Sequence, residues 1–163
     1  MKLYVVRHVK AGDRSRWVGS DHERPISKSG RRQAVALAHR LAGENVSALI
    51  ASPSLRCVQS LEPLGELAGL KVEEDDRLAE GSSIEESMAV ARDAPDRAVL
   101  CSHGDVIPDL IAALVRRGME LTNEPDWRKA TLWVLEGTKH ARKSSGGELL
   151  FQTASVEPPP PID

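Results

Sequence analysis

The chain has 163 residues, 40% of them hydrophobic and 28% charged, which is typical of a soluble globular protein with one core. Its net charge of −2 gives no global basic field for a nucleic acid polymer, and an aromatic content of 3% disfavours a base-stacking platform. The chain begins on a strand-like run and has no long apolar span, so we expect a cytoplasmic protein without membrane contact. Its two cysteines lack metal-ligand spacing and fit a reducing compartment.

The first half of the chain alternates short apolar runs with helical periodicity. Ser52 and Pro53 are expected to open a helix, because serine caps helices and proline suits the first helical position. Pro63 should kink or restart that helix. The elements expected before Ser52 are a strand at 3–6, a helix at 27–43 capped by serine, and a strand at 46–51.

The second half continues the alternation and ends in a segment rich in proline. The expected elements are a weak strand at 70–72, a helix at 83–91, a strand at 98–101, a helix at 104–115, and strands at 131–135 and 148–153. A polar loop at 139–147 should pair the last two strands as a hairpin. We therefore predict one domain over residues 1–156, followed by an extended and solvated tail at 157–163 with four consecutive prolines.

Strands that alternate with helices predict an α/β fold, a three-layer α/β/α sandwich around a mainly parallel sheet. In such sheets, ligands bind at the carboxyl edge, where the strands end and the helices begin. The polar segment 10–24 has no periodicity and should form a long loop over that edge, which favours a functional role.

Charged or titratable side chains occur at three of the predicted strand ends. Arg7 and His8 end the first apolar run, Arg56 lies one turn into the helix after the second strand, and His103 follows the strand at 98–101. Each of these residues alone is weak evidence for function, but loops at one sheet edge bring them into a single site. Two arginines beside two histidines indicate an anionic ligand, and phosphate is the obvious candidate.

These residues belong to a larger set of motifs that resembles the histidine phosphatase superfamily, which includes phosphoglycerate mutases and small phosphohistidine phosphatases. The motifs are Val-Val-Arg-His at 5–8, Arg-Pro-Ile-Ser at 24–27, Gly-Arg-Arg-Gln-Ala at 30–34, Ala-Ser-Pro-Ser-Leu-Arg-Cys-Val-Gln-Ser at 51–60, Leu-Ala-Glu at 78–80, and Ser-His-Gly at 102–104. Stretches at 15–25, 106–112 and 131–135 are similar to phosphatase-like domains attached to some bacterial MutT-type Nudix hydrolases. The Nudix box itself is absent from this sequence.

The resemblance implies a phosphoglycerate mutase-like fold and a phosphatase that needs no metal or cofactor. His8 would attack phosphorus and carry a phosphohistidine intermediate. Arg7, Arg56 and His103 would bind the phosphoryl oxygens. Glu80 would be the general acid for the leaving group and the base for the water, although it lies in an acidic stretch that is equally typical of a solvated surface.

Further residues are candidates for binding the substrate. Arg24 either closes the pocket or anchors the loop to an acidic neighbour. Lys10, Arg14 and Trp17 in the long loop, and Lys129 before the strand at 131–135, are candidates for contacting the rest of the substrate, with solvated charge as the alternative. The remaining histidines, which are His22, His39 and His140, are expected to be solvated.

One position departs from the family pattern: Val9 stands where the family normally has glycine after the nucleophile. Glycine permits backbone angles and close approach that a β-branched residue resists. The alternative function is therefore a catalytically impaired module that binds phosphate or regulates a partner. For an active enzyme the substrate would be a phosphohistidine protein, a nucleotide or a small phosphometabolite. A mutase is disfavoured by the chain's short length, and a metal-dependent hydrolase by the lack of ligand spacing.

Overall fold

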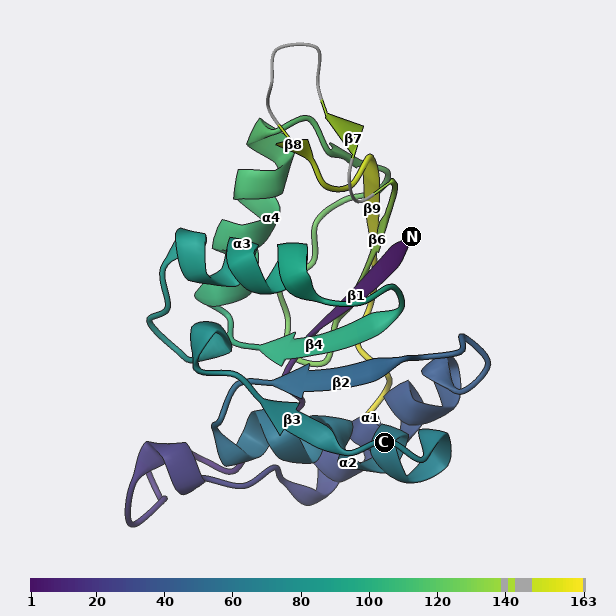
Figure 1. The fold of residues 1–163 in the computed structure, drawn as a ribbon. Helices are drawn as coiled ribbons and strands as arrows, with labels where there is room; N and C mark the ends of the chain where they lie inside the picture. Colours follow the sequence, from purple (N-terminus) through teal and green to yellow (C-terminus); the bar gives the residue numbers. More distant parts are fainter. Residues whose placement is uncertain (139–140, 143–147, 163) are drawn as a thin grey trace.

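The computed structural model describes residues 1–138, 141–142 and 148–162. Its centre is a seven-stranded sheet in the order β3-β2-β4-β1-β6-β9-β5 (Figure 1). The strands are β1 (Lys2–Arg7), β2 (Ala48–Ala51), β3 (Val72–Glu74), β4 (Ala98–Ser102), β5 (Glu120–Leu121), β6 (Leu132–Glu136) and β9 (Thr153–Glu157). A separate antiparallel pair consists of β7 (Ala141–Arg142) and β8 (Glu148–Leu149).

The sheet is mainly parallel, as predicted. Strand β4 pairs in parallel with β1 and with β2, and β2 pairs in parallel with β3. Strand β6 is antiparallel to both of its neighbours, β1 and β9. The carboxyl ends of β1, β2, β3 and β4 therefore lie at one edge of the sheet, together with the amino end of β6.

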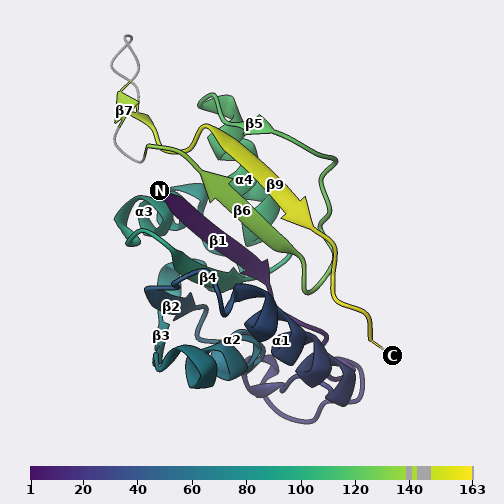
Figure 2. The ribbon, with the colours of Figure 1, turned by 90° about the vertical axis from the view of Figure 1, so that its right-hand side faces the viewer.

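Helices cover both faces of the sheet and complete the predicted three-layer sandwich (Figure 2). Helices α1 (Lys28–Leu41) and α2 (Leu55–Ala68) pack on one face, and α3 (Ile84–Asp93) and α4 (Val106–Arg116) pack on the other. Two one-turn 3-10 helices, η1 (Asp21–Glu23) and η2 (Asp76–Leu78), lie in the connections. The fold class expected from the sequence is confirmed.

The alternation of side chains along β1 explains why the central strands are continuous apolar runs. Leu3 and Val5 are buried in the core under α3 and α4, whereas Tyr4 and Val6 are buried in the core under α1 and α2. A strand covered on both faces has no solvent-facing positions, so it shows no polar alternation. Such strands also fix the carboxyl edge firmly, because moving their ends would disturb both cores.

The start of α2 differs from the prediction. Its N-cap is Ser54 and its first residue is Leu55, so Ser52 and Pro53 lie before the helix. The helix then continues through Pro63 without a break, at the expense of the backbone hydrogen bond that proline cannot donate. Other helix and strand boundaries lie within about two residues of the expected positions.

The last strand is also displaced from the prediction. The run at 148–153 indicated one strand paired across the loop at 139–147. Only β8 (Glu148–Leu149) forms at that place, paired antiparallel with β7, and Leu150 and Phe151 are buried against the α3 and α4 core. The strand that pairs with β6 is β9, whose residues alternate between half-buried and buried with small side chains, a weaker sequence signal. The short strand β5 was not predicted. The expected loop at 139–147 lies largely outside the described residues.

In the described part of the tail, residues 158–162, Pro158, Pro161 and Ile162 are exposed as expected, but the backbone is also held by contacts with α1. Arg32 on α1 donates two hydrogen bonds to the carbonyl of Ile162, at 3.2 and 2.9 Å, and Gln33 Nε2 donates to the carbonyl of Pro160 at 3.3 Å. Arg40 and Glu157 form an ion pair at 2.6 Å just before this segment. The C-terminal segment therefore lies along α1 (Figure 2).

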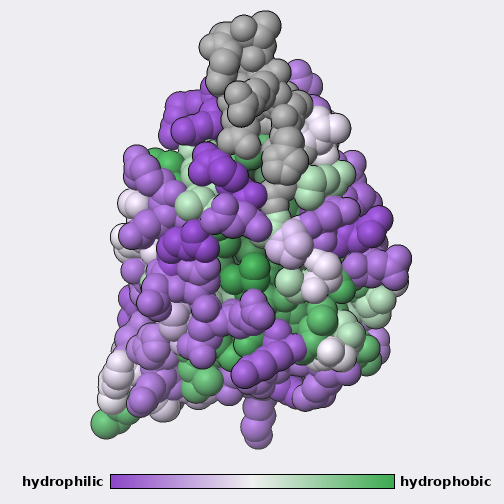
Figure 3. Space-filling view, viewed as in Figure 1, coloured by the Kyte–Doolittle hydropathy of each residue, from purple (hydrophilic) through white to green (hydrophobic). Residues whose placement is uncertain are grey.

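The outer face over β2, β3 and α3 is mostly hydrophilic, with small apolar areas between the charged side chains (Figure 3). No helix in the described part of the chain is both long enough and apolar enough to span a bilayer.

Candidate active site

The two predicted histidines meet at the carboxyl edge of β1 and β4. Arg7, the last residue of β1, pairs in register with Ser102, the last residue of β4. The amide of His8 then donates to the carbonyl of Ser102 at 3.1 Å, which ties the two strand ends together. The ring centroids of His8 and His103 lie 5.5 Å apart, edge to face. The strands thus place both imidazoles in one site.

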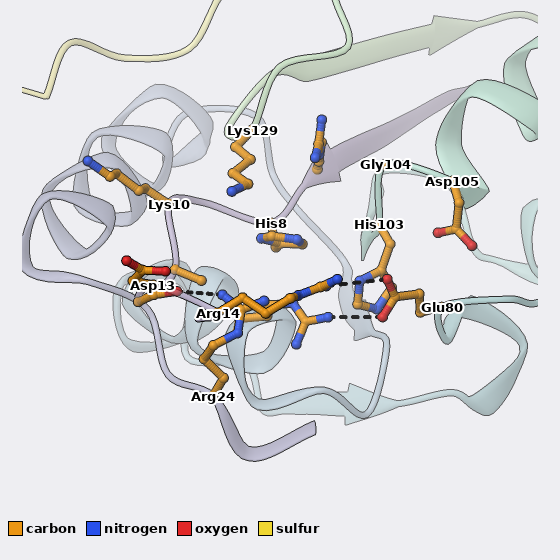
Figure 4. Close-up of a pocket in the computed structure, with 14 residues that line it drawn as sticks. His8, Lys10, Asp13, Arg14, Arg24, Glu80, His103, Gly104, Asp105 and Lys129 are labelled. Carbon is orange, nitrogen blue, oxygen red and sulfur yellow. Dashed lines mark hydrogen bonds and ion pairs between the residues drawn. The ribbon is translucent and has the colours of Figure 1, made fainter. Parts of the chain in front are cut away.

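A cavity of about 850 Å³ lies over these histidines (Figure 4). Six cationic and three carboxylate side chains line it, so cations are in excess although the whole chain carries a net charge of −2. Such a local excess favours an anionic ligand. The lining residues are Arg7, His8, Lys10, Ala11, Gly12, Asp13, Arg14, Arg24, Arg56, Glu80, His103, Gly104, Asp105 and Lys129.

A backbone carbonyl fixes the orientation of the His8 imidazole. Its Nδ1 lies 2.9 Å from the carbonyl oxygen of Val9, which can only accept a hydrogen bond, so Nδ1 carries the proton. The lone pair of the neutral ring is then on Nε2. Burial, and to a smaller extent the neighbouring His103 and Arg56, lower the pKa of His8 to about 3. His8 is therefore neutral near pH 7.

This low pKa predicts how stability depends on pH. In the unfolded chain, histidine takes up a proton near pH 6.5, whereas His8 in the folded chain does not do so until about pH 3. The unfolded state therefore binds more protons within this window, and His8 should lower the free energy of unfolding by about 1 kcal/mol for each unit that the pH falls between about 6 and 4. Urea unfolding of the wild type and of His8→Asn in phosphate-free buffer measures this slope. Parallel pH dependences of the two proteins would contradict the prediction.

His103 is held by a residue whose role was predicted incorrectly. Ser52, expected to cap α2, is fully buried and its Oγ lies 2.8 Å from Nε2 of His103. Cys57 Sγ lies 3.6 Å from the same nitrogen. Because Nε2 is engaged, Nδ1 is the nitrogen of His103 left for a ligand. Ser52 is thus a positioning residue that connects the end of β2 to the site.

Two arginines in the site have buried nitrogen atoms without hydrogen-bond partners. The Arg7 guanidinium donates from Nη1 to the carbonyl of Trp127 at 2.5 Å, but its Nε is buried and unpaired. Arg56, with a side chain only 1% exposed, also has a buried and unpaired Nε. Unpaired donors of this kind are costly in a folded protein unless a ligand or water satisfies them. Both arginines line the cavity, so an anion there would supply acceptors.

Glu80 lies at the same edge, after β3 and η2, and it is paired with arginine. Its Oε2 accepts from Nη2 of Arg56 at 3.3 Å, and its Oε1 lies 3.6 Å from Nη2 of Arg14. Figure 4 shows Arg14 extending across the cavity to this carboxylate. The carboxylate of Glu80 is half-exposed and lines the cavity, where it is accessible to a leaving group or a water molecule.

The loop at 10–24 is held over the cavity by Asp21, which the sequence analysis did not single out. Its carboxylate pairs with Arg24 at 2.9 Å, with Arg56 at 3.2 Å and with Arg14 at 3.5 Å. Arg24 is buried and also donates to the carbonyl of Gly12 at 2.6 Å. Arg24 therefore anchors the loop to an acidic neighbour and also lines the cavity. Its role in closing the pocket over a substrate stays a prediction. The spacing of Asp21 three residues before Arg24 was the available signal.

The other predicted binding residues differ in their placement. Lys10 and Lys129 both line the cavity, and Figure 4 shows Lys129 reaching toward His8 while the amine of Lys10 points away. The pKa of Lys129 is lowered mainly by its partial burial and, to a smaller extent, by the positive charge of nearby arginines. Trp17 does not line the cavity: its indole donates to the carbonyl of Ser20 within the loop. Its role in binding stays a prediction.

Val9 does not obstruct the site. Its φ angle is not positive, its side chain is fully buried in the core under α1 and α2, and it is not among the cavity residues. The amide of Val9 donates to Ser60 Oγ at 3.0 Å. Gly30 makes room for this turn, because a Cβ at Gly30 would lie 1.9 Å from the carbonyl oxygen of Lys10 and 3.2 Å from the Val9 side chain. The valine is therefore accommodated by the opposing glycine.

The remaining histidines and possible metal ligands complete the description of the site. His22 and His39 are exposed, as expected, and His140 lies outside the described residues. Within residues 1–138, 141–142 and 148–162, no group of three or more His, Cys, Asp or Glu side chains is placed to hold a metal ion.

Comparison with known proteins identifies the family to which the chain belongs. Residues 3–86 match the family model of the histidine phosphatase superfamily, branch 1. The chain is 34% identical over 139 residues to an 8-oxo-(d)GTP phosphatase of Mycolicibacterium smegmatis. The chain therefore belongs to the histidine phosphatase superfamily.

The known proteins differ in how much of their length and of this chain the match covers. The match to the Mycolicibacterium protein covers 82% of this chain but only 43% of that protein, so the chain spans less than half the length of this relative. A protein histidine phosphatase SixA, solved with tungstate, superposes with a TM-score of 0.69 at 20% identity, covering 96% of this chain and 94% of that one. A mycobacterial glucosyl-3-phosphoglycerate phosphatase gives 0.65 at 21% identity, covering 96% of both chains. At these identities the two structures support the fold alone.

Proposed function

We propose that the chain hydrolyses a phosphomonoester or phosphoramidate without a metal, through a phosphohistidine intermediate on His8. The observation that carries this proposal is the juxtaposition of a neutral, buried His8 with two arginines whose buried Nε atoms lack partners. The buried arginines supply charge for the phosphoryl oxygens, and the proton on Nδ1 of His8 leaves Nε2 free to attack.

The first step forms the bond between Nε2 of His8 and phosphorus and breaks the bond to the leaving group. Charge on the three equatorial oxygens is stabilised by Arg7, Arg56 and Nδ1 of His103, acting as preorganised donors. The carbonyl of Val9 stabilises the positive imidazole ring that forms, because it accepts the Nδ1 proton. Glu80, in its protonated form, would give its proton to the departing oxygen or nitrogen.

In the second step, water attacks phosphorus and releases His8. Glu80 takes a proton from this water, and inorganic phosphate leaves with the protein restored to its starting state. The ion pairs of Glu80 with Arg56 and Arg14 must open when phosphate enters, because the phosphate oxygens compete for the same guanidinium groups. The arginines thus change partners between the empty and the loaded site.

A nucleotide is the substrate that we propose first, because the relative from Mycolicibacterium is named as an 8-oxo-(d)GTP phosphatase. A phosphohistidine protein is the second candidate, since the cavity is open at the sheet edge and lined by residues of an exposed loop. We also propose a cytoplasmic location, which the two free cysteines of the described chain support.

The test is release of inorganic phosphate from a panel of nucleoside mono-, di- and triphosphates, small phosphometabolites and a phosphohistidine protein. Each substrate is assayed with wild type and with His8→Ala, with and without EDTA. We expect turnover that EDTA does not change and that His8→Ala removes. Turnover that disappears with EDTA would overturn the metal-independent mechanism, and phosphate binding without turnover of any substrate would favour the noncatalytic module.

Gly104→Ala should weaken phosphate binding about tenfold, as expected when one charge-assisted hydrogen bond is misaligned. A Cβ at Gly104 would lie 2.7–3.0 Å from the guanidinium of Arg7, so this flexible side chain must shift from its present position in the cavity wall. The inhibition constant of inorganic phosphate measures the change. The matched control is Gly43→Ala, where a Cβ meets no atom within 4 Å. Equal constants for the two variants would show that Arg7 does not bind the phosphate.

Ser52→Ala should lower kcat about tenfold and leave KM nearly unchanged, because one lost hydrogen bond of about 1.4 kcal/mol corresponds to a factor of ten. Without the Ser52 hydroxyl, the ring of His103 loses the contact that fixes its orientation. Steady-state kinetics separate kcat from KM, and urea unfolding of the same protein reports stability. A loss of stability with unchanged kcat would assign Ser52 a purely structural role.

A further inference from the structure

The carboxylate of Asp105 lines the cavity, although the excess of cations there favours an anionic ligand. A negative charge in this place repels a phosphate, because like charges at close range disfavour each other. Of the other two carboxylates in the cavity wall, Glu80 is the proposed acid and base, and Asp13 accepts hydrogen bonds from Ser15 within its own loop. The mechanism proposed above gives Asp105 no role, so its position needs another explanation.

Asp105 does not cap its own helix, which is the usual role of an aspartate in its position. It is the N-cap residue of α4, yet its side chain makes no capping hydrogen bond to that helix. Its Oδ2 instead accepts from the backbone amide of Gly81 at 2.8 Å, across 24 positions in the chain. Gly81 directly follows Glu80. Asp105 therefore joins the start of α4 to the turn that carries Glu80.

A second contact holds the other side of the same turn. The hydroxyl of Ser102 donates to the carbonyl of Leu78 at 2.6 Å, and both residues are buried. Gly81 has a φ angle of 83°, a left-handed conformation in which the chain turns directly after Glu80. The turn is thus attached on both sides of Glu80, and both attachments come from the junction of β4 and α4.

Resting on the proposed function, we infer that Asp105 is a positioning residue that holds Glu80 in place for the transfer of its proton to the leaving group. The same junction carries His103, the proposed donor to the phosphoryl oxygens, so it sets the acid and this donor relative to each other. General acid catalysis requires the acid to lie within hydrogen-bond reach of the departing atom. Figure 4 shows Asp105, His103 and Glu80 on the same side of His8. Asp105 acts through the turn and transfers no proton itself.

The test compares two aryl phosphates that share the phosphoryl group and differ in the leaving group. Phenolate leaves slowly unless it is protonated, whereas 2,4-dinitrophenolate is a stable anion that leaves without an acid. The value of kcat/KM reports the transfer of the phosphoryl group to His8 from free enzyme and substrate. We expect Asp105→Ala to lower kcat/KM for phenyl phosphate about tenfold, the effect of one lost hydrogen bond, and to change it less than about twofold for 2,4-dinitrophenyl phosphate.

Asp105→Asn distinguishes a hydrogen-bond acceptor from a charge or a proton donor. The amide oxygen of asparagine can still accept from Gly81, but the side chain has no charge and no acidic proton. We therefore expect Asp105→Asn to keep the ratio of the two kcat/KM values of the wild type. The charge of Asp105 also attracts Arg7, where it partly offsets burial, which lowers the pKa of Arg7. A change at Arg7 acts on the phosphoryl group that both esters share, so it cancels in this ratio.

The matched control is Asp109→Ala, which removes an exposed carboxylate from the first turn of α4 and should keep both kcat/KM values. Hydrogen exchange of the Gly81 amide, followed by NMR, reports the contact without any turnover. Exchange should be faster in Asp105→Ala than in the wild type and unchanged in Asp105→Asn. Equal exchange in Asp105→Ala and the wild type would overturn the inference.

Two kinetic outcomes would also overturn it. A tenfold loss with phenyl phosphate in Asp105→Asn would show that the carboxylate acts by its charge or as an acid. An equal loss with both esters in Asp105→Ala would show that the protonation of the leaving group is not affected.

Glu80→Gln separates this inference from the proposed function. It should lower kcat/KM about a hundredfold for phenyl phosphate and much less for 2,4-dinitrophenyl phosphate. A selective loss in Glu80→Gln without one in Asp105→Ala would reject the positioning role alone. Phosphate release by the wild type without a selective loss in Glu80→Gln would reject Glu80 as the acid, and the role of Asp105 with it. A wild type that releases no phosphate from either ester would reject the proposed catalysis.

Discussion

Replacing His8 with alanine should reduce phosphate release by at least about a thousandfold, because loss of a covalent nucleophile removes the reaction path itself. Among the described residues, the other candidate nucleophiles beside His8 have different roles. His103, 5.5 Å away, has Nε2 engaged by Ser52 and is proposed to donate from Nδ1 to the phosphoryl oxygens, and the thiol of Cys57 is buried against Nε2 of His103. The residual rate should be that of direct attack by water on a phosphate bound by the remaining cationic side chains.

The same variant tests the intermediate directly. When wild type is mixed with a ³²P-labelled substrate and quenched in alkali, the protein should retain label that acid removes, as expected for a phosphohistidine. His8→Ala should retain none. The matched control is His39→Ala on the exposed face of α1, which should keep both the label and the rate of the wild type. Labelling of His8→Ala at the wild-type level would reject His8 as the nucleophile.

The convergence of the site was predictable because the central strands are buried on both faces. Such strands appear in the sequence as continuous apolar runs, and the residues just after them must lie at one sheet edge. His8 follows β1 and His103 follows β4, and these strands pair in register to their last residues. Arg56 was found in the same way, one turn into the helix after β2. Topology alone therefore brings these side chains together.

Ser52 could not be assigned from the sequence. A serine followed by proline is a normal helix-cap pattern, and the residue at the N-cap position, Ser54, is only two residues away. The hydrogen bond from Ser52 reaches His103, 51 residues further along the chain. Nothing local distinguishes a serine that caps a helix from one that orients a distant imidazole.

The contacts between the C-terminal segment and α1 could not be predicted, for a related reason. Its prolines have no periodic pattern and no side-chain hydrogen bonds, so composition alone indicates a solvated chain. The structure instead holds this segment through its backbone carbonyls, which accept from Arg32 and Gln33. Every residue has a carbonyl, so such contacts leave no trace in the sequence.

Replacing Arg56 with lysine should lower kcat/KM by about a hundredfold or more, the usual effect of removing one donor that stabilises charge in the transition state. Lysine keeps the positive charge but loses the planar fork that binds two phosphate oxygens at once. The side chain of Arg56 is 1% exposed, so a shorter cation in its place cannot be supplemented by water molecules of matching geometry. The effect should therefore be far larger than for a surface arginine.

In the absence of phosphate, Arg56→Lys should change the free energy of unfolding little. An effect on phosphate binding can therefore be distinguished from an effect on folding. The carboxylates that pair with Arg56 are those of Asp21 and Glu80, which are 40% and 50% exposed, so water can hydrate them when the arginine is lost. In contrast, phosphate at a hundred times its dissociation constant should stabilise the wild type by about 2.7 kcal/mol, a gain that the variant should largely lose at the same concentration. Thermal unfolding with and without phosphate measures both quantities.

The matched control for this substitution is Arg77→Lys. Arg77 also forms two ion pairs, with Asp75 at 2.8 Å and Asp93 at 3.2 Å, but it does not line the cavity over His8 and His103. We expect Arg77→Lys to keep both the turnover rate and the stabilisation by phosphate of the wild type, because Arg77, Asp75 and Asp93 do not line the cavity in which phosphate is proposed to bind. Full stabilisation by phosphate in Arg56→Lys would contradict the prediction. The guanidinium of Arg56 in the wild type would then only pair with Asp21 and Glu80, and the phosphoryl group would be bound by Arg7 and His103.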